Sequence, residues 1–159
     1  MKPSYHVTTS TILSGVLYLM TKSWGMAVAC FLSGILIDLD HVLDYMIIYG
    51  WRTFTIRRFF YVFYHVRFKQ IYLFFHAWEW LIILLGAAWM TGWNPWLVGL
   101  FAGIGLHMIL DYFHNGGYIW SYSLILRWKN KFDFETTFPG LMKYRDHVGN
   151  KWSKIRSIY

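Results

Sequence analysis

The sequence is poor in cysteine, in proline and in charge. Its single cysteine, Cys30, excludes an internal disulfide framework and leaves no thiolate cluster for a metal ion. Only three prolines occur, and the chain carries no Pro/Ser-rich linker, internal repeat or low-complexity tract. Charged residues make up 14% of the 159 residues, against about 25% in soluble domains. With 57% hydrophobic residues, this balance predicts one small integral membrane protein rather than two independent soluble cores.

The net charge of +7 would suit a nucleic-acid partner, but its distribution argues against one. Basic residues fall in two blocks, 52–69 and 127–156, which both flank apolar segments. This placement is typical of the cytoplasmic loops of membrane proteins. We therefore expect anionic lipid headgroups as partners, and no nucleic acid.

Four apolar segments indicate an all-α, polytopic helical bundle of about four membrane spans. They cover residues 6–23, 25–44, 71–92 and 95–114. The last of them would be about 30 Å long as a helix, which equals one hydrocarbon thickness. The first is short in its strongly apolar part, so a re-entrant or tilted segment is the alternative there.

Loop charges predict the orientation of these spans. With four spans, both basic blocks lie on one side, and the positive-inside rule assigns that side and both termini to the cytoplasm. This predicts a multi-pass protein of the cell inner membrane. Residues 1–120 would form the bundle, with 52–69 as a basic amphipathic helix in the headgroup region, and 121–159 a basic cytoplasmic tail.

Ionisable residues occur inside or at the ends of these apolar segments, where they need compensation. An Asp at the centre of a bilayer-spanning helix costs roughly 2.5–3.5 kcal/mol. In the predicted topology these residues all lie toward the cytoplasmic ends of their segments. They are His6, Asp38, Asp40, His41, His76, Glu79, His107, Asp111 and His114. Imidazoles and carboxylates at one depth predict a bound metal ion.

Helical spacing groups several of these side chains. His107, Asp111 and His114 span about 60° of arc on an ideal helix, which is one face. His76 and Glu79 would share a face by the same reasoning, at i, i+3. The spacing therefore predicts that each pair or triplet points toward one site.

The Asp-Leu-Asp-His segment is less simple. Asp38 and His41 are neighbours at i, i+3, but Asp40 points the other way on an ideal helix. Either the helix is distorted there, or Asp40 orients a ligating imidazole instead of binding the ion.

These considerations assign roles to three sets of residues. The candidate metal ligands are His6, Asp38, His41, His76, His107 and Asp111. The candidate general-base or supporting groups are Asp40, Glu79 and His114. The candidate headgroup-binding residues are Arg67, Lys69 and Arg127. The donor set suits zinc first, with manganese or iron as alternatives, and is large enough for one or two ions.

At these residues the chain resembles a bacterial and archaeal family of small inner-membrane proteins described as membrane-bound, metal-dependent hydrolases. The matching motifs are His6, Asp38-Leu39-Asp40-His41, His76 and His107-x3-Asp111, within the first 115 residues. Ile37 and Phe74-Phe75 depart from the family's pattern. The family is remotely similar to zinc-dependent phospholipases C. The resemblance implies a metal-activated water that attacks a lipid or lipid-linked substrate, with a phosphoester as one class.

Two other classes of function use similar residues. A membrane di-iron hydroxylase or desaturase also places histidines at cytoplasmic helix ends, although such enzymes cluster more of them. A non-enzymatic protein could ligate a haem through His76 and His107, or carry ions or protons along its acids. Haem leaves the aspartates unexplained, and transport predicts polar residues along whole spans.

Overall fold

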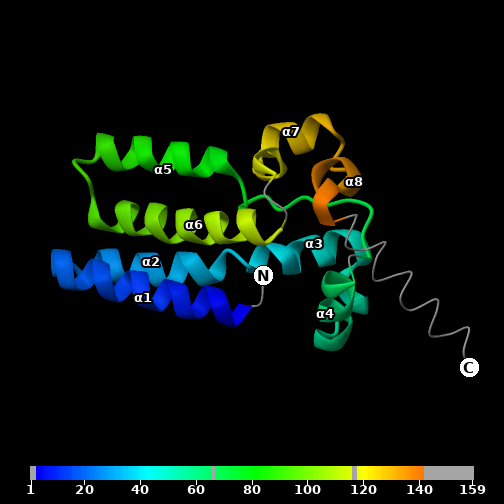
Figure 1. Ribbon diagram of the computed structural model, residues 1–159, viewed down its shortest axis with the longest axis horizontal. Helices are drawn as coiled ribbons and strands as arrows, with labels where there is room; N and C mark the ends of the chain where they lie inside the picture. The colour runs from blue at the N-terminus through cyan, green and yellow to red at the C-terminus, as the bar shows by residue number, and fades with distance from the viewer. Residues whose placement is uncertain (1–2, 66, 116–117, 142–159) are drawn as a thin grey trace, which may run out of the picture.

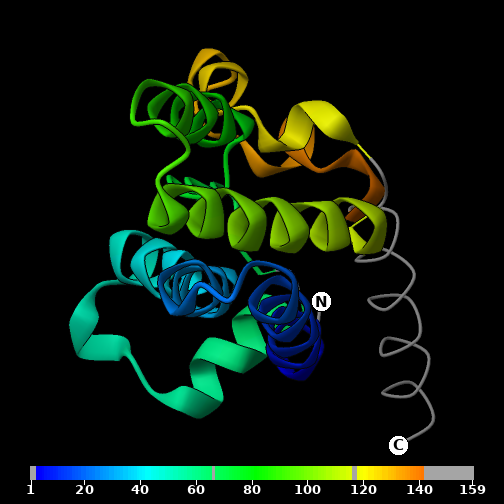
Figure 2. The ribbon, with the colours of Figure 1, turned by 90° about the vertical axis from the view of Figure 1, so that its left-hand side faces the viewer.

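The computed structural model describes residues 3–65, 67–115 and 118–141, which form helices and loops without a β-strand. The bundle consists of α1 (Pro3–Thr21), α2 (Trp24–Leu36), α5 (Trp78–Met90) and α6 (Pro95–His114) (Figure 1). Helix α6 lies between α5 on one side and α1 with α2 on the other (Figure 2). The predicted all-α class is therefore confirmed over the described residues.

Small residues allow α2 and α6 to approach closely. A Cβ at Gly99 would lie 2.3 Å from the Met26 carbonyl oxygen, and one at Gly103 would lie 2.3 Å from the Cys30 carbonyl oxygen. Ser33 donates from its Oγ to the carbonyls of Cys30 and Leu100, so it links the two helices. This contact sets the position of the end of α6, where His107 and Asp111 lie.

Among the described residues, two helices are long and apolar enough to cross a membrane. One is the 26-residue stretch Trp24–Tyr49, and the other is Pro95–His114 with 20 residues. Helix α5 is apolar but has 13 residues, and it begins at Trp78 rather than near the predicted residue 71. Residues 70–77 precede it as a non-helical segment. The second and fourth predicted segments thus meet the criteria for a span.

The stretch Trp24–Tyr49 contains a tight turn at Ile37 and Asp38. Helix α2 ends at Leu36 and α3 (Leu39–Tyr49) begins shortly after it. Across this junction the amide of Asp40 donates to Ile37 and that of His41 donates to Asp38, three residues back instead of four. The distortion anticipated for this segment is therefore present, and it alters the directions in which Asp38 and Asp40 point.

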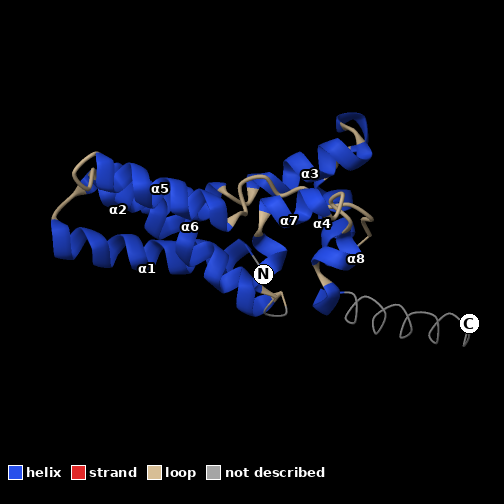
Figure 3. Ribbon diagram, turned by 90° about the horizontal axis from the view of Figure 1, so that it is seen from above, coloured by secondary structure: helices blue, strands red, loops and turns tan. Residues whose placement is uncertain are grey.

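Short elements cover one end of the bundle (Figure 3). They are η1 (Trp51–Thr53), α4 (Ile56–Tyr64), η2 (Ile119–Tyr122), α7 (Leu124–Lys129) and α8 (Phe134–Thr137). Within 52–69 the structure has a 3₁₀ turn and the nine-residue α4. Buried aromatic side chains, including Tyr45, Tyr122 and Phe134, pack these elements together. Of the predicted tail 121–159, residues up to 141 belong to this layer, and 142–159 lie outside the described residues.

Candidate metal centre

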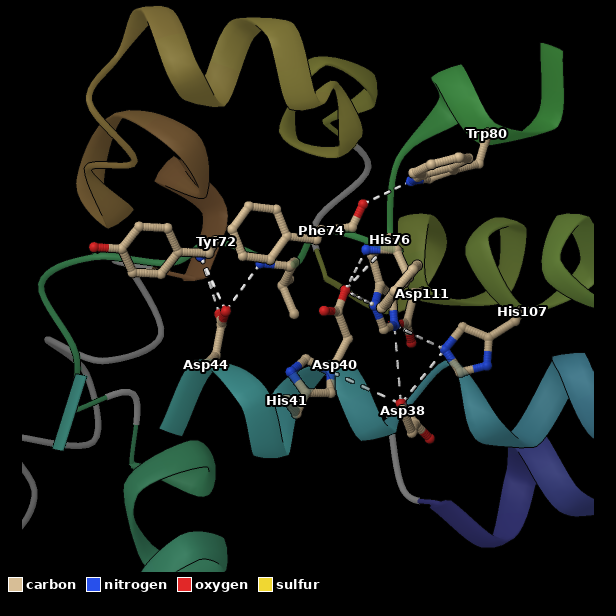
Figure 4. Close-up of polar contacts among 12 residues, drawn as sticks. Asp38, Asp40, His41, Asp44, Tyr72, Phe74, His76, Trp80, His107 and Asp111 are labelled. Atoms are coloured by element: carbon tan, nitrogen blue, oxygen red, sulfur yellow. Dashed lines mark hydrogen bonds and ion pairs between the residues drawn. The ribbon is translucent and has the colours of Figure 1, made fainter. Parts of the chain in front are cut away.

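Several segments bring imidazoles and carboxylates to one end of the bundle (Figure 4). The end in question is where α1 and α5 begin and where α2 and α6 finish. The buried members are His6, Asp40, His76, His107 and Asp111. Asp38 and His41 are the more accessible members, with side chains 28% and 25% exposed. Distant parts of the chain thus bring these groups together at one end of the bundle.

His107 points its Nε2 into the cluster because its other ring nitrogen is held. Its Nδ1 lies 2.9 Å from the carbonyl oxygen of Gly34. Because a carbonyl only accepts, Nδ1 carries the proton and Nε2 of a neutral ring presents a lone pair. That Nε2 lies 3.5 Å from Oδ1 of Asp38 and 3.6 Å from Oδ2 of Asp111. The i, i+4 pairing predicted for His107 and Asp111 is therefore seen.

His76 is held in the same manner by a carboxylate. Its Nδ1 lies 3.1 Å from Oδ2 of Asp40, and the same oxygen accepts the backbone N–H groups of Phe75 and His76. The carbonyl of His76 in turn accepts from Nη2 of Arg127. Asp40 thus orients an imidazole, which is one of the two roles that the sequence left open.

The two imidazoles face each other across a short gap. Nε2 of His76 and Nε2 of His107 are 3.2 Å apart. With both Nδ1 atoms donating, two neutral rings would point lone pairs at one another, which is unfavourable in a buried site. A proton or a cation between them removes this repulsion. Ligands of a tetrahedral zinc ion lie about 3.3–3.6 Å from one another, so the spacing suits a shared metal.

In the part of the chain that the structure describes, three overlapping groups of side chains could hold an ion, with ligand atoms within 4.8 Å of one another. They are His6, His107 and Asp111; Asp38, His76 and His107; and His41, His76 and Asp111. Nε2 of His6 lies 3.2 Å from Oδ1 of Asp111. The ring of His6 also stacks on that of His107, with the ring centroids 3.7 Å apart. The residues fit a divalent cation in number and type, and the overlap leaves room for one ion or two.

The charge balance of this region also favours a cation. Four carboxylates lie in this region, those of Asp38, Asp40, Asp44 and Asp111. Among the described residues, the buried cation near them is Arg127. Burial lowers the pKa of Arg127 to about 10, although the surrounding carboxylates oppose this shift. Asp40 and Asp44 accept backbone N–H groups, but these hydrogen bonds leave their negative charges in place, and one guanidinium does not balance four carboxylates.

Asp44 was not among the predicted site residues. Its carboxylate accepts the backbone N–H groups of Tyr72 and Leu73, each at 3.0 Å. Leu73 has a φ of +45°, a conformation that an L residue adopts at a cost of about 1–2 kcal/mol. Asp44 lies one helical turn after Asp40, so the i, i+4 spacing was the available signal. Together the two carboxylates hold the segment that carries His76.

Two predicted supporting groups lie elsewhere. Glu79 accepts from the Ser123 hydroxyl and from the backbone N–H groups of Leu124 and Ile125, so it binds the start of α7. The expectation that His76 and Glu79 share a helical face is wrong, because α5 begins between them. His114, the last residue of α6, is exposed and belongs to none of the three ligand groups.

The three candidate headgroup-binding residues are placed differently from one another. Arg67 and Lys69 are exposed beside α4, where an anionic headgroup could reach them. Arg127 is 1% exposed and contacts the backbone of His76, so it is not a surface residue. This burial was not predicted, because Arg127 lies in a basic stretch of the kind that is usually solvated.

Comparisons of the chain with protein-family models, with curated proteins and with solved structures gave no significant match. The function must therefore be argued from the geometry of the cluster.

Proposed function

We propose that this protein is a membrane-embedded, metal-dependent hydrolase that acts on a lipid or lipid-linked phosphoester. The observation that carries the proposal is the 3.2 Å separation of the His76 and His107 Nε2 atoms, with Asp38 and Asp111 beside them. A bound divalent cation would supply a hydroxide near neutral pH and would polarise the scissile group. Zinc fits this donor set best, with manganese and iron as alternatives.

The chain's own residues divide into buried and accessible groups. His76, His107 and Asp111 are fixed and buried, which suits ligands that must not move. Asp38 and His41 are partly exposed, so substrate and water would reach the cluster on their side. His41 has no hydrogen-bond partner for Nδ1 among the described residues, and it is the imidazole we assign to accept the proton of the attacking water.

Exposed apolar side chains support a location within the membrane. Ile82 and Trp89 of α5 are each 72% exposed, and Ile12, Leu19 and Met20 of α1 also point outward. In water such surfaces would favour aggregation, whereas lipid tails would cover them. We therefore infer that α1 and α5 complete a four-helix membrane bundle with the two longer helices.

The substrate class follows from the position of the cluster relative to basic residues. Arg57 and Arg58 on α4, with Arg67 and Lys69 after it, lie in the layer that covers the cluster end of the bundle. The ring of Phe63 on the same helix packs edge-on against that of His41, with the ring centroids 5.0 Å apart. By the positive-inside rule this end would face the cytoplasm. An anionic lipid headgroup bound by these cations would lie next to the accessible side of the cluster.

The alternatives receive less support from the geometry. A haem between His76 and His107 would need a porphyrin plane between two nitrogens that are 3.2 Å apart. A di-iron oxidoreductase remains the second interpretation, because the cluster could hold two ions.

Turnover in a defined membrane tests the proposal. The purified protein, in phosphatidylcholine nanodiscs with zinc, manganese or iron, would be assayed for hydrolysis of phospholipids and prenyl phosphates. We expect activity that His107→Ala abolishes and that His114→Ala, the matched control on the same helix, retains. Oxygen consumption with iron, without hydrolysis of any ester, would contradict hydrolysis and support the oxidoreductase.

A further inference from the structure

Arg127 is a buried cation with unused hydrogen-bonding capacity. Its side chain is 1% exposed, and Nη2 donates to the carbonyl of His76 at 2.8 Å. Nε and Nη1 have no hydrogen-bond partner among the described residues. No described carboxylate forms an ion pair with the guanidinium, although Asp40, Asp44 and Glu79 influence it from farther away. Buried guanidinium groups are normally paired, so these two nitrogens indicate a ligand.

Arg127 is one of the residues that line a cavity of about 110 Å³. Residues of η2, α7 and α8 line it, together with residues next to these elements. Of the described residues in this lining, Arg127 carries the charge. Ser121, Asn130, Thr136 and Thr137 supply polar groups to the wall. The volume is several times the roughly 30 Å³ that one water occupies in the liquid. The cavity therefore has space for a small polyatomic anion.

The mouth of the cavity carries aromatic side chains that are unusual on a surface facing water. Tyr118 and Trp120 line the cavity and are 51% and 64% exposed. Trp128 on α7 is exposed as well. Exposed Trp and Tyr residues concentrate at the level of lipid headgroups in membrane proteins. The cavity thus opens among residues that suit contact with phosphate-bearing lipid.

We propose that the cavity beside Arg127 is a phosphate-binding site, filled by the phosphate of a lipid headgroup or by inorganic phosphate. Guanidinium groups bind phosphate oxygens through charge-assisted hydrogen bonds, and Nε and Nη1 supply two such donors. The amide of Asn130 adds further N–H donors at the rim. The site shares no lining residue with the three candidate ligand groups. It does not depend on the proposed hydrolase activity.

Binding to metal-free protein tests the proposal. The chelator-treated full chain, in neutral detergent at constant ionic strength, would be titrated with inorganic phosphate and, separately, with micellar phosphatidic acid, using calorimetry. We expect saturable binding of one equivalent. Binding of both probes would indicate a site for either source, and binding of phosphatidic acid alone would indicate a lipid site.

Two variants and a control locate the site. Asn130→Asp places a carboxylate at the rim of the cavity without changing the core, and we expect it to weaken binding by about tenfold or more. Lys129→Gln removes the same net charge from an exposed neighbour on α7 and should bind as wild type does. Arg127→Met should abolish binding in protein that remains folded. Absence of binding by either probe, or equal binding by wild type and Asn130→Asp, would overturn the proposal.

Discussion

Asp40 binds His76 at two points, through the ring and through the backbone. Its Oδ2 lies 3.1 Å from the ring Nδ1 and 3.1 Å from the backbone nitrogen of the same residue. One carboxylate oxygen therefore sets both the position of this residue and the tautomer of its imidazole. Carboxylate–histidine pairs of this kind support many metal sites, where they fix the ring and increase its basicity.

This relationship predicts the behaviour of Asp40→Asn. The amide keeps an oxygen that can accept from the ring and from the backbone, but it lacks the negative charge of the carboxylate, so it holds the His76 imidazole less firmly and leaves it less basic. We expect zinc affinity to fall by about 10–100-fold, measured by competition with a chromogenic chelator. Asp133→Asn, which alters a carboxylate at the start of α8, is the control and should leave the affinity unchanged. Equal affinities for Asp40→Asn and wild type would show that this carboxylate does not support a metal ligand.

Asp44→Ala should destabilise the fold through the segment before α5. The change leaves the amides of Tyr72 and Leu73 without their acceptor, and an unsatisfied buried donor costs about 1–3 kcal/mol. Unfolding in detergent would measure the loss of stability, and hydrogen exchange would report increased exchange at these two amides. Unchanged exchange at both positions would contradict the role assigned to Asp44.

Gly103→Ala tests the close contact between α2 and α6. The added Cβ would lie 2.3 Å from the Cys30 carbonyl oxygen and 2.2 Å from the Ser33 hydroxyl. We expect a loss of about 1–3 kcal/mol in unfolding free energy, as in other overpacked cores. Gly86→Ala on α5 is the matched control, because no atom lies within 4 Å of the place that its new methyl group would take, and it should be neutral or stabilising. Equal stabilities would show that the helices do not pack as closely as described.

Glu79→Ala distinguishes a structural carboxylate from a catalytic one. Because Glu79 accepts from Ser123 and from two amides at the start of α7, its loss should cost about 0.5–2 kcal/mol of stability, as the loss of a helix cap does. Metal content and turnover per folded molecule should not change. A folded variant with normal metal content but without turnover would restore the catalytic role that the sequence suggested.

The sequence predicted the cluster best where regular helices carry it. The spacing of His107 and Asp111 places them on one face of α6, and they meet there. Prediction was less accurate where the backbone departs from a helix. The apolar run after Gln70 has the composition of the start of a span, yet the carboxylates of Asp40 and Asp44 hold it in a non-helical conformation. Such long-range contacts to backbone amides leave no periodic signal in the sequence.

The buried position of Arg127 was equally hidden. Lys129 and Lys131, which follow it closely in the sequence, are exposed, whereas Arg127 is buried by packing of α7 over the segment that carries His76. Local composition predicts solvent exposure in such a case, whereas tertiary contact determines the outcome.

The metal content of the purified protein tests the central claim most directly. Elemental analysis would be made on wild type, on the double variant His76→Ala/His107→Ala, and on His114→Ala as the control. We predict at least one divalent ion per chain in wild type and in the control, and its loss in the double variant. A folded wild-type protein that takes up no divalent ion, even when zinc, manganese and iron are supplied, would contradict the account.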